Sequence, residues 1–174
     1  MSEYTVRPLQ LGDAEALGAV HITIWREAYA GLMPPSYLRG LSVERSVLRW
    51  RTVAVEPAAG TATVVGLADG EVVGFSTAGP TRDEPADPAS ELWVVNVLAA
   101  HHGSGLARRL VAAAFDGAGI GADDAVSLWV ARGNDRACAF YRRLGFAPDG
   151  RTKAHEPTGT VEERWVRPAR ANVR

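Results

Sequence analysis

The chain has 174 residues, of which 47% are hydrophobic and 22% are charged, and its formal net charge at pH 7 is -1. This length and composition predict one globular domain over residues 1–174, and the small net charge excludes a broad cationic surface for nucleic acid. No run reaches the roughly 18 apolar residues of a membrane span, and the N-terminus MSEYTVRPLQ lacks the apolar region of a secretory signal. With its single cysteine, Cys138, the chain is therefore expected to be cytoplasmic, with no membrane partner.

The N-terminal third predicts one strand followed by helices. YTVRPLQ, residues 4–10, is typical of a strand, and Asp13 is positioned to cap the helix that follows. The apolar face of that helix consists of Leu17, Val20, Ile24 and Ala28. Residues 33–55 predict one or two short helices, the first begun by two prolines and the second marked by Ser42.

Residues 61–100 predict three strands. Asp69-Gly70 lies between two β-rich runs, which is the strongest short-range signal for a hairpin. Residues 81–90, rich in proline and aspartate, predict a loop. ELWVVNVLAA, residues 91–100, has too many consecutive apolar residues for a half-exposed strand and is expected to be central in the sheet.

The C-terminal part predicts two further helices and three strand segments. Leu106, Leu110 and Ala114 lie in helical register, and a second helix extends from its cap at Asn134 to Gly145. The strand segments are residues 125–132, 146–150 and 160–168. This order of elements predicts a mixed α/β sheet rather than a regular βαβ ladder.

The stretch AAHHGSGLARRLVAAAF, residues 99–115, has the pattern of an anion site. A strand that ends in a glycine turn and opens a helix leaves N–H groups unpaired at the positive end of the helix dipole. Gly103 and Gly105 let a phosphate approach the backbone, and Arg108 and Arg109 add positive charge. The alternative is a tight strand-to-helix turn that binds no ligand.

Two common phosphate loops do not match this stretch. A P-loop needs a lysine after its second glycine, and none follows here. A dinucleotide loop needs a third glycine where Arg108 stands, and an acidic residue about 20 positions on, at the end of the next strand. Asp123 and Asp124 precede that strand instead of ending it. The remaining class of ligand is coenzyme A.

Here the chain resembles the GCN5-related N-acetyltransferase (GNAT) superfamily. The pyrophosphate motif of that superfamily is Arg or Gln, two variable residues, Gly, one variable residue, and Gly or Ala. It falls on His102, Gly105 and Ala107, with histidine in place of the usual first residue. A second signature follows in VARGNDRACAFYRRLGF, in which the matching positions are Asn134, Ala137, Tyr141, Leu144, Gly145 and Phe146.

The resemblance covers most of the chain from about residue 61 and implies a fold. It implies a mixed, mostly antiparallel central sheet flanked by helices and splayed between the central strand and the next. It also implies that the final strand, residues 160–168, could pair across the subunits of a homodimer.

The resemblance further implies where acetyl-CoA, the expected co-substrate, would bind, with no metal required. Backbone amides of the central strand, at Val95, Asn96 and Val97, would pair with pantetheine. Asn134 would hold pantetheine, cap its helix, or do both. The pyrophosphate loop consists of His102, Gly103, Ser104, Gly105, Leu106, Ala107 and Arg108. A solvated helix face is expected for Arg136, Arg142 and Arg143, one of which could meet the 3′-phosphate.

Candidates exist for both proton transfers of the family's reaction. An alkylammonium of pKa near ~10 must lose a proton before it attacks the thioester, and Glu91 stands where several relatives carry a base. Glu91 could equally be a strand-end carboxylate that faces solvent, and Asp83 and Glu84 are weaker candidates. Tyr141 occupies the position of the acid that protonates the leaving thiolate, and its alternative role is that of a core aromatic residue.

The acceptor is the least defined part of the reaction. Trp25 and Tyr29 share a helical face and could form an aromatic wall for a small amine, or simply pack on the sheet. The function expected from the resemblance is acetyl transfer from acetyl-CoA to a primary amine of a small molecule or peptide, by direct attack in a ternary complex. The alternative is a non-catalytic acyl-CoA-binding or sensing module on the same fold.

Overall fold

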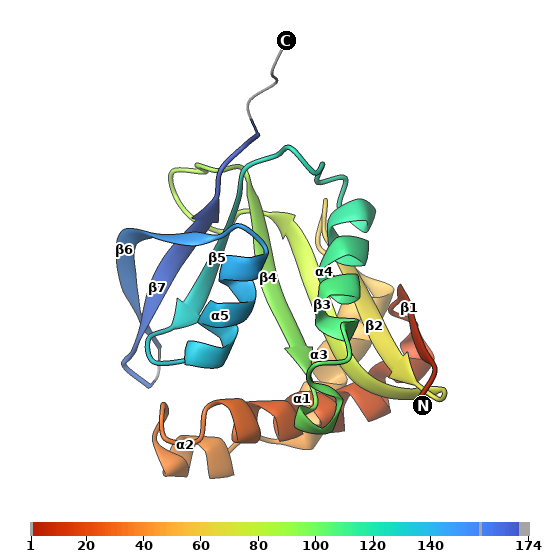
Figure 1. The fold of residues 1–174 in the computed structure, drawn as a ribbon. Helices are drawn as coiled ribbons and strands as arrows, with labels where there is room; N and C mark the ends of the chain where they lie inside the picture. Colours follow the sequence, from red (N-terminus) through yellow and green to blue (C-terminus); the bar gives the residue numbers. More distant parts are fainter. Residues whose placement is uncertain (1, 157, 171–174) are drawn as a thin grey trace.

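A computed structural model of the chain describes residues 2–156 and 158–170. They form a seven-stranded sheet in the order β1-β2-β3-β4-β5-β7-β6, with helices on both faces (Figure 1). All neighbouring strands pair antiparallel except β4 and β5, which are parallel. The expected mixed, mostly antiparallel sheet is confirmed. None of the described helices is long and apolar enough to cross a membrane.

The N-terminal elements follow the predicted order. They are β1 (Tyr4–Pro8), α1 (Ala14–Ala28), α2 (Pro35–Arg39) and α3 (Val43–Val55). Ser42 caps α3, since its side chain accepts a hydrogen bond from the backbone N–H of Arg45 at 3.1 Å. The prediction for Asp13 is wrong in detail. Its carboxylate makes no capping bond to α1 and instead accepts from the N–H of Gln10 and the guanidinium of Arg7, because a short 3₁₀ turn precedes the helix.

The hairpin at Asp69-Gly70 is confirmed. It joins β2 (Ala62–Ala68) to β3 (Glu71–Pro80), and both turn residues have positive φ, 50° at Asp69 and 89° at Gly70. This is the backbone of a type I′ turn, whose twist matches that of the strands.

The predicted splay is at the middle of the sheet. β4 (Ser90–Val97) pairs with β5 (Val126–Ala131) only through Ser90↔Val126 and Glu91↔Ser127. On its other side β4 stays paired with β3, but the register shifts so that one β4 residue, Trp93, is extra. Beyond Glu91 the edge of β4 that faces β5 therefore has no strand partner.

Two helices cover one face of this opened sheet. They are α4 (Leu106–Gly117), which follows a short 3₁₀ turn at Ala99–His101, and α5 (Asp135–Arg143). The residues predicted to share a face of α4, Leu106, Leu110 and Ala114, are all buried in the larger core. α1 and α3 pack on the opposite face in a second core.

The C-terminal hairpin corrects one expectation. It consists of β6 (Ala147–His155) and β7 (Thr160–Arg167), and β7 lies between β5 and β6 with both of its edges paired. The prediction that residues 160–168 pair across subunits is therefore wrong, because no edge of this strand is free. Within the described chain the outer strands of the sheet are β1 and β6.

His21 of α1 lies in an aromatic cluster beneath the sheet. Its ring centre is 5.5 Å from that of Trp50 and 5.1 Å from that of Phe75. Its Nδ1 accepts a hydrogen bond from the indole N–H of Trp50 at 3.1 Å. Burial, with a smaller contribution from the charge of Arg49, lowers the pKa of His21 to about 4. The neutral ring is thus the form that the fold accommodates.

This depressed pKa predicts a pH-dependent stability. The unfolded chain takes up a proton near pH 6.5 and the folded chain only near 4, so the stabilisation is complete above 6.5 and declines between those values. Relative to a His21→Asn variant, which keeps an acceptor for Trp50, the wild type should lose up to about 3 kcal/mol of unfolding free energy between pH 6.5 and 4. Urea unfolding of both proteins across that range measures it. If the unfolding free energies of the two proteins changed with pH in the same way, the assignment of the lowered pKa to His21 would be contradicted.

Candidate functional site

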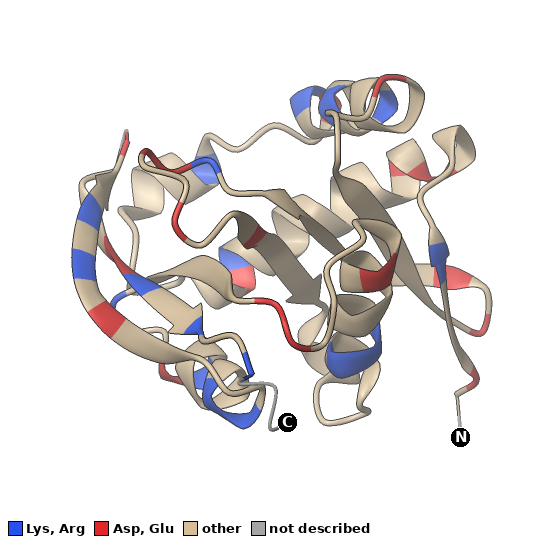
Figure 2. Cartoon of the chain, turned by 90° about the horizontal axis from the view of Figure 1, so that it is seen from above, with Lys and Arg blue, Asp and Glu red and all other residues tan. Residues whose placement is uncertain are grey.

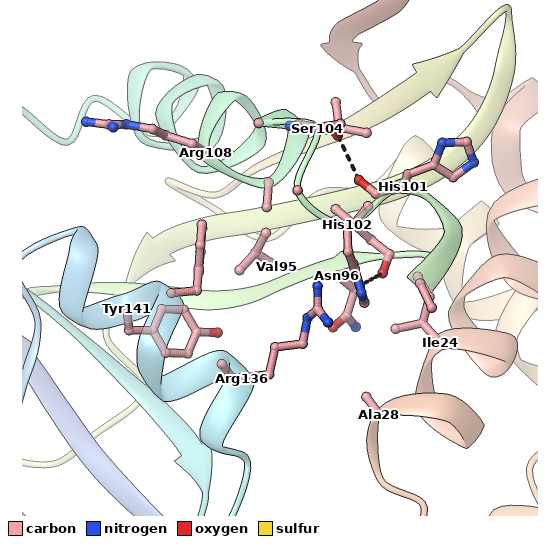
Figure 3. Close-up of a pocket in the computed structure, with 18 of the residues that line it drawn as sticks. Ile24, Ala28, Val95, Asn96, His101, His102, Ser104, Arg108, Arg136 and Tyr141 are labelled. Atoms are coloured by element: carbon pink, nitrogen blue, oxygen red, sulfur yellow. Dashed lines mark hydrogen bonds between the residues drawn. The ribbon is translucent and has the colours of Figure 1, made fainter. Parts of the chain in front are cut away.

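A cavity of about 620 Å³ opens where β4 and β5 part (Figure 3). Its walls are the end of β4, the glycine loop, the first turn of α4, one face of α5 and part of α1. The cavity brings together Tyr141, Asn134 and every predicted cofactor-binding residue of β4 and the loop, which are Val95, Asn96, Val97, His102, Gly103, Ser104, Gly105, Leu106, Ala107 and Arg108. It does not include Glu91, Trp25 or Tyr29.

The glycine loop has the conformation expected of an anion site. Gly103 and Gly105 have φ of 80° and 84°, a region that residues with a Cβ rarely adopt. Ser104 braces the turn, since its hydroxyl donates to the carbonyl of His101 at 2.7 Å (Figure 3). Within the described chain no protein acceptor is recorded for the N–H groups of residues 103–105, 107 and 108. These donors lie at the positive end of α4, where an anion is stabilised.

His102, the departure from the family motif, has a structural task. Its Nε2 lies 2.8 Å from the carbonyl oxygen of Val97. Because that oxygen can only accept, Nε2 carries the proton and the ring ties the loop to the end of β4. The neighbouring ring of His101 turns away to Tyr4, whose hydroxyl is 3.1 Å from Nδ1.

The cavity carries a local excess of positive charge. Arg108, Arg136 and Arg143 line it, and among the described lining residues Glu27 is the single carboxylate. Arg136 extends from α5 toward Asn96 (Figure 3). Basic and acidic residues are otherwise interspersed over the chain (Figure 2), so the excess of positive charge is local to the rim of the cavity.

The predicted solvated face of α5 is confirmed, since Arg136, Arg142 and Arg143 are all exposed. Arg136 and Arg143 line the cavity, and Arg142 packs with its guanidinium carbon 5.0 Å from the ring centre of Trp165. Sequence reasoning missed Phe140 as a lining residue. Positions 136, 140 and 143 are spaced by four and three and form a stripe of their own, which the face of Asn134 and Tyr141 does not predict.

Tyr141 presents its phenol to the cavity. The hydroxyl points inward from α5 (Figure 3) and has no hydrogen-bond partner among the described residues. Burial raises the pKa of this phenol above its ordinary value of 10, with a smaller contribution from Tyr29. Tyr141 is therefore protonated at neutral pH and free to donate to a ligand.

Asn134 combines a confirmed cap with a place in the cavity wall. Its Oδ1 accepts a hydrogen bond from the N–H of Ala137 at 3.2 Å, which caps α5. The rest of the side chain faces the cavity. The two roles predicted for it are thus compatible.

Glu91 does not reach the cavity. Its exposure is 0%, so the alternative that it faces solvent is wrong. Its carboxylate accepts from the backbone N–H of Arg82 at 2.8 Å and forms an ion pair with the guanidinium of the same residue. The weaker candidate Asp83 is held by the indole N–H of Trp129 at 3.0 Å, and Glu84 is exposed.

Trp25 and Tyr29 lie beside the cavity rather than in its wall. Their ring centres are 4.9 Å apart, and that of Trp25 is 6.1 Å from His155 on β6. The neighbouring stripe of α1, Ile24 and Ala28, lines the cavity instead. Both were on the predicted apolar face, but periodicity does not say which part of a face meets a cavity. Among the described residues no cluster of three or more His, Cys, Asp or Glu could hold a metal ion.

Comparison with known proteins agrees with this geometry. Residues 22–146 match the model of the acetyltransferase (GNAT) family. An uncharacterized N-acetyltransferase, YuaI of Bacillus subtilis (strain 168), is 29% identical over 108 residues, which are 62% of this chain and 60% of the relative. The match thus spans less than two thirds of that relative's length.

Solved structures share the fold. PaiA N-acetyltransferase from Thermoplasma acidophilum, in complex with coenzyme A, has a TM-score of 0.67 at 18% identity, covering 92% of this chain and 98% of that one. PH1933 from Pyrococcus horikoshii OT3 has a TM-score of 0.71 at 20% identity, covering 97% and 100%. The family model spans more than half of the chain, and this chain belongs to the acetyltransferase (GNAT) family.

Proposed function

We propose that this chain transfers the acetyl group of acetyl-CoA to a primary amine of a small molecule or peptide, by direct attack in a ternary complex. The observation that carries the proposal is one cavity with two features: an array of loop N–H groups and the protonated phenol of Tyr141, neither of which has a recorded partner among the described residues. Membership of the acetyltransferase family supports the reaction class. The free phenol favours an enzyme over a sensing module, which needs no acid.

The phosphates of acetyl-CoA suit the cationic half of the cavity. The pyrophosphate would accept from the N–H groups of residues 103–105, 107 and 108. Arg108, Arg136 and Arg143 would neutralise the remaining phosphate charge. Pantetheine would lie along Val95, Asn96 and Val97, where β4 lacks a partner, and so replace the missing strand.

Acetyl-CoA supplies the activated acyl group, and the chain handles protons and charge around it. The amine nitrogen forms the new bond to the thioester carbon, the carbon–sulfur bond breaks, and Tyr141 donates its proton to the departing sulfur. The backbone N–H groups of β4 stabilise the oxyanion on the way. We assign no base to Glu91, because Arg82 occupies its carboxylate. The acceptor ammonium first loses one proton to water. After the attack its nitrogen loses a second proton, which returns through water to the phenolate of Tyr141.

We further propose a cytoplasmic location, in which Cys138 stays reduced, and a small-molecule acceptor without nucleic acid or membrane. Any homodimer would form through a surface other than β7, whose edges are both paired.

The loop prediction has a matched control. Gly105→Ala forces a Cβ onto a positive φ, and relief of that strain moves the N–H groups, so acetyl-CoA affinity should fall about tenfold. Gly150→Ala carries the same kind of strain at φ 91° on β6, outside the cavity, and should bind acetyl-CoA normally. Isothermal titration measures both. Equal losses in the two variants would contradict a loop-specific site.

Tyr141→Phe removes the proposed acid without removing the ring. The turnover number should fall about 100-fold or more, while affinity for acetyl-CoA stays within a few-fold of wild type. Because burial raises the pKa of Tyr141 above 10, wild-type activity should not decline up to pH 10 through loss of this proton. Thiol release under saturating substrates measures both. Unchanged turnover in the variant would remove Tyr141 from the mechanism.

Glu91→Gln separates anchoring from base catalysis. Loss of the buried charge opposite Arg82 should lower the unfolding free energy by about 1–3 kcal/mol. Turnover by the folded variant should stay within a few-fold of wild type. Denaturant unfolding and thiol release give the two values, and a turnover about 100-fold lower would restore Glu91 as the base.

A further inference from the structure

The face of β7 that meets α1 carries an acidic side chain. Thr160 lies on this face, since its hydroxyl donates to the carbonyl of Leu32, after α1, at 3.3 Å. Side chains alternate along a strand, so Glu162 shares the face of Thr160. Glu163 points the other way and pairs with Arg132 at 2.8 Å. Glu162 therefore faces α1, next to the parting of β4 and β5.

Within the described chain, the carboxylate of Glu162 has one cationic partner, its cross-strand neighbour Lys153, at long range. Its side chain is 19% exposed, and no hydrogen bond to it is recorded among the described residues. The nearest cation, the ammonium of Lys153, is 3.9 Å away and lies 4.0 Å from the ring centre of Trp129, which it also contacts. A largely buried carboxylate is stabilised by a closer cation or donor. The position is thus receptive to a cationic ligand.

Aromatic rings of α1 lie on the same side. Trp25 reaches the C-terminal hairpin at His155, and Tyr29 packs on Trp25. Burial and the charge of Glu162 raise the pKa of Tyr29 to about 12, so its phenol stays neutral beside the carboxylate. A carboxylate next to aromatic faces is a favourable environment for an ammonium group.

We propose that Glu162, with Tyr29 and Trp25, binds a cationic group of the acceptor that does not itself react. Ala28, the residue before Tyr29, lines the cavity together with Tyr141, so the bound charge would lie beside the cavity in which the amine reacts. The acceptor is then a small molecule with a second positive charge, such as a diamine. This inference rests on the proposed acetyl transfer, and Glu162 is its specificity-determining residue.

The binding arm of the test does not depend on catalysis. With the protein saturated with CoA, titration of 1,4-diaminobutane into wild type, Glu162→Gln and Glu163→Gln compares two adjacent acids on opposite faces of β7. Affinity should fall tenfold or more in Glu162→Gln and stay unchanged in Glu163→Gln. No measurable binding to wild type, or equal effects of the two substitutions, would overturn the proposal. Unchanged CoA affinity shows that each variant is folded.

The kinetic arm tests whether Glu162 binds a second positive charge of the acceptor, separate from the amine that reacts. Wild type should acetylate 1,4-diaminobutane at least tenfold more efficiently than 1-aminobutane, and Glu162→Gln should remove this preference by raising the KM of the diamine. The KM of acetyl-CoA should not change. A preference that survives in Glu162→Gln overturns the assignment. Absence of transfer to either amine, with binding that depends on Glu162, would instead reject the proposed function and leave the cation site standing.

Discussion

The early parting of β4 from β5 is the constraint on which the rest of the site depends. After Glu91↔Ser127 the two parallel strands lose contact, and the backbone groups along one edge of β4 are left without a strand partner. Inside a sheet such groups need another partner, and an amide-bearing ligand can provide one. The cavity begins at this edge with Val95 and ends at the glycine loop, so one geometric feature sets both its position and its ligand chemistry.

At the end where β4 and β5 are still paired, the sheet carries ion pairs that include buried side chains. Glu91, at the last paired position, binds Arg82 in the loop between β3 and β4. Arg164 of β7 continues the connection. Its side chain is 6% exposed, lies 3.5 Å from Asp83 and also pairs with Asp149. Charges removed from water persist where they are paired, and here the pair of Arg164 with Asp83 joins the two halves of the sheet.

Charge is divided between the two sides of the opening. Arginines of α4 and α5 line the side of the glycine loop, whereas Glu162 and the aromatic rings of α1 lie toward β7. In the proposed reaction, a polyanionic donor and a cationic acceptor would approach from different sides and meet at Tyr141, whose pKa is raised by burial. Complementary charge would also keep each ligand out of the other's site.

The sequence by itself determined the features that depend on a few neighbouring residues. The turn at Asp69-Gly70, the glycine loop and the cap at Asn134 follow from local backbone preferences, and so do most helices and strands. The sequence predicts a base or a solvated carboxylate at Glu91, because position along a strand does not reveal a partner in a neighbouring loop. Tertiary packing alone likewise decides that Trp25 faces β6. It also decides that β7 lies between two other strands. Both depend on contacts between segments far apart in the chain, which no local pattern encodes.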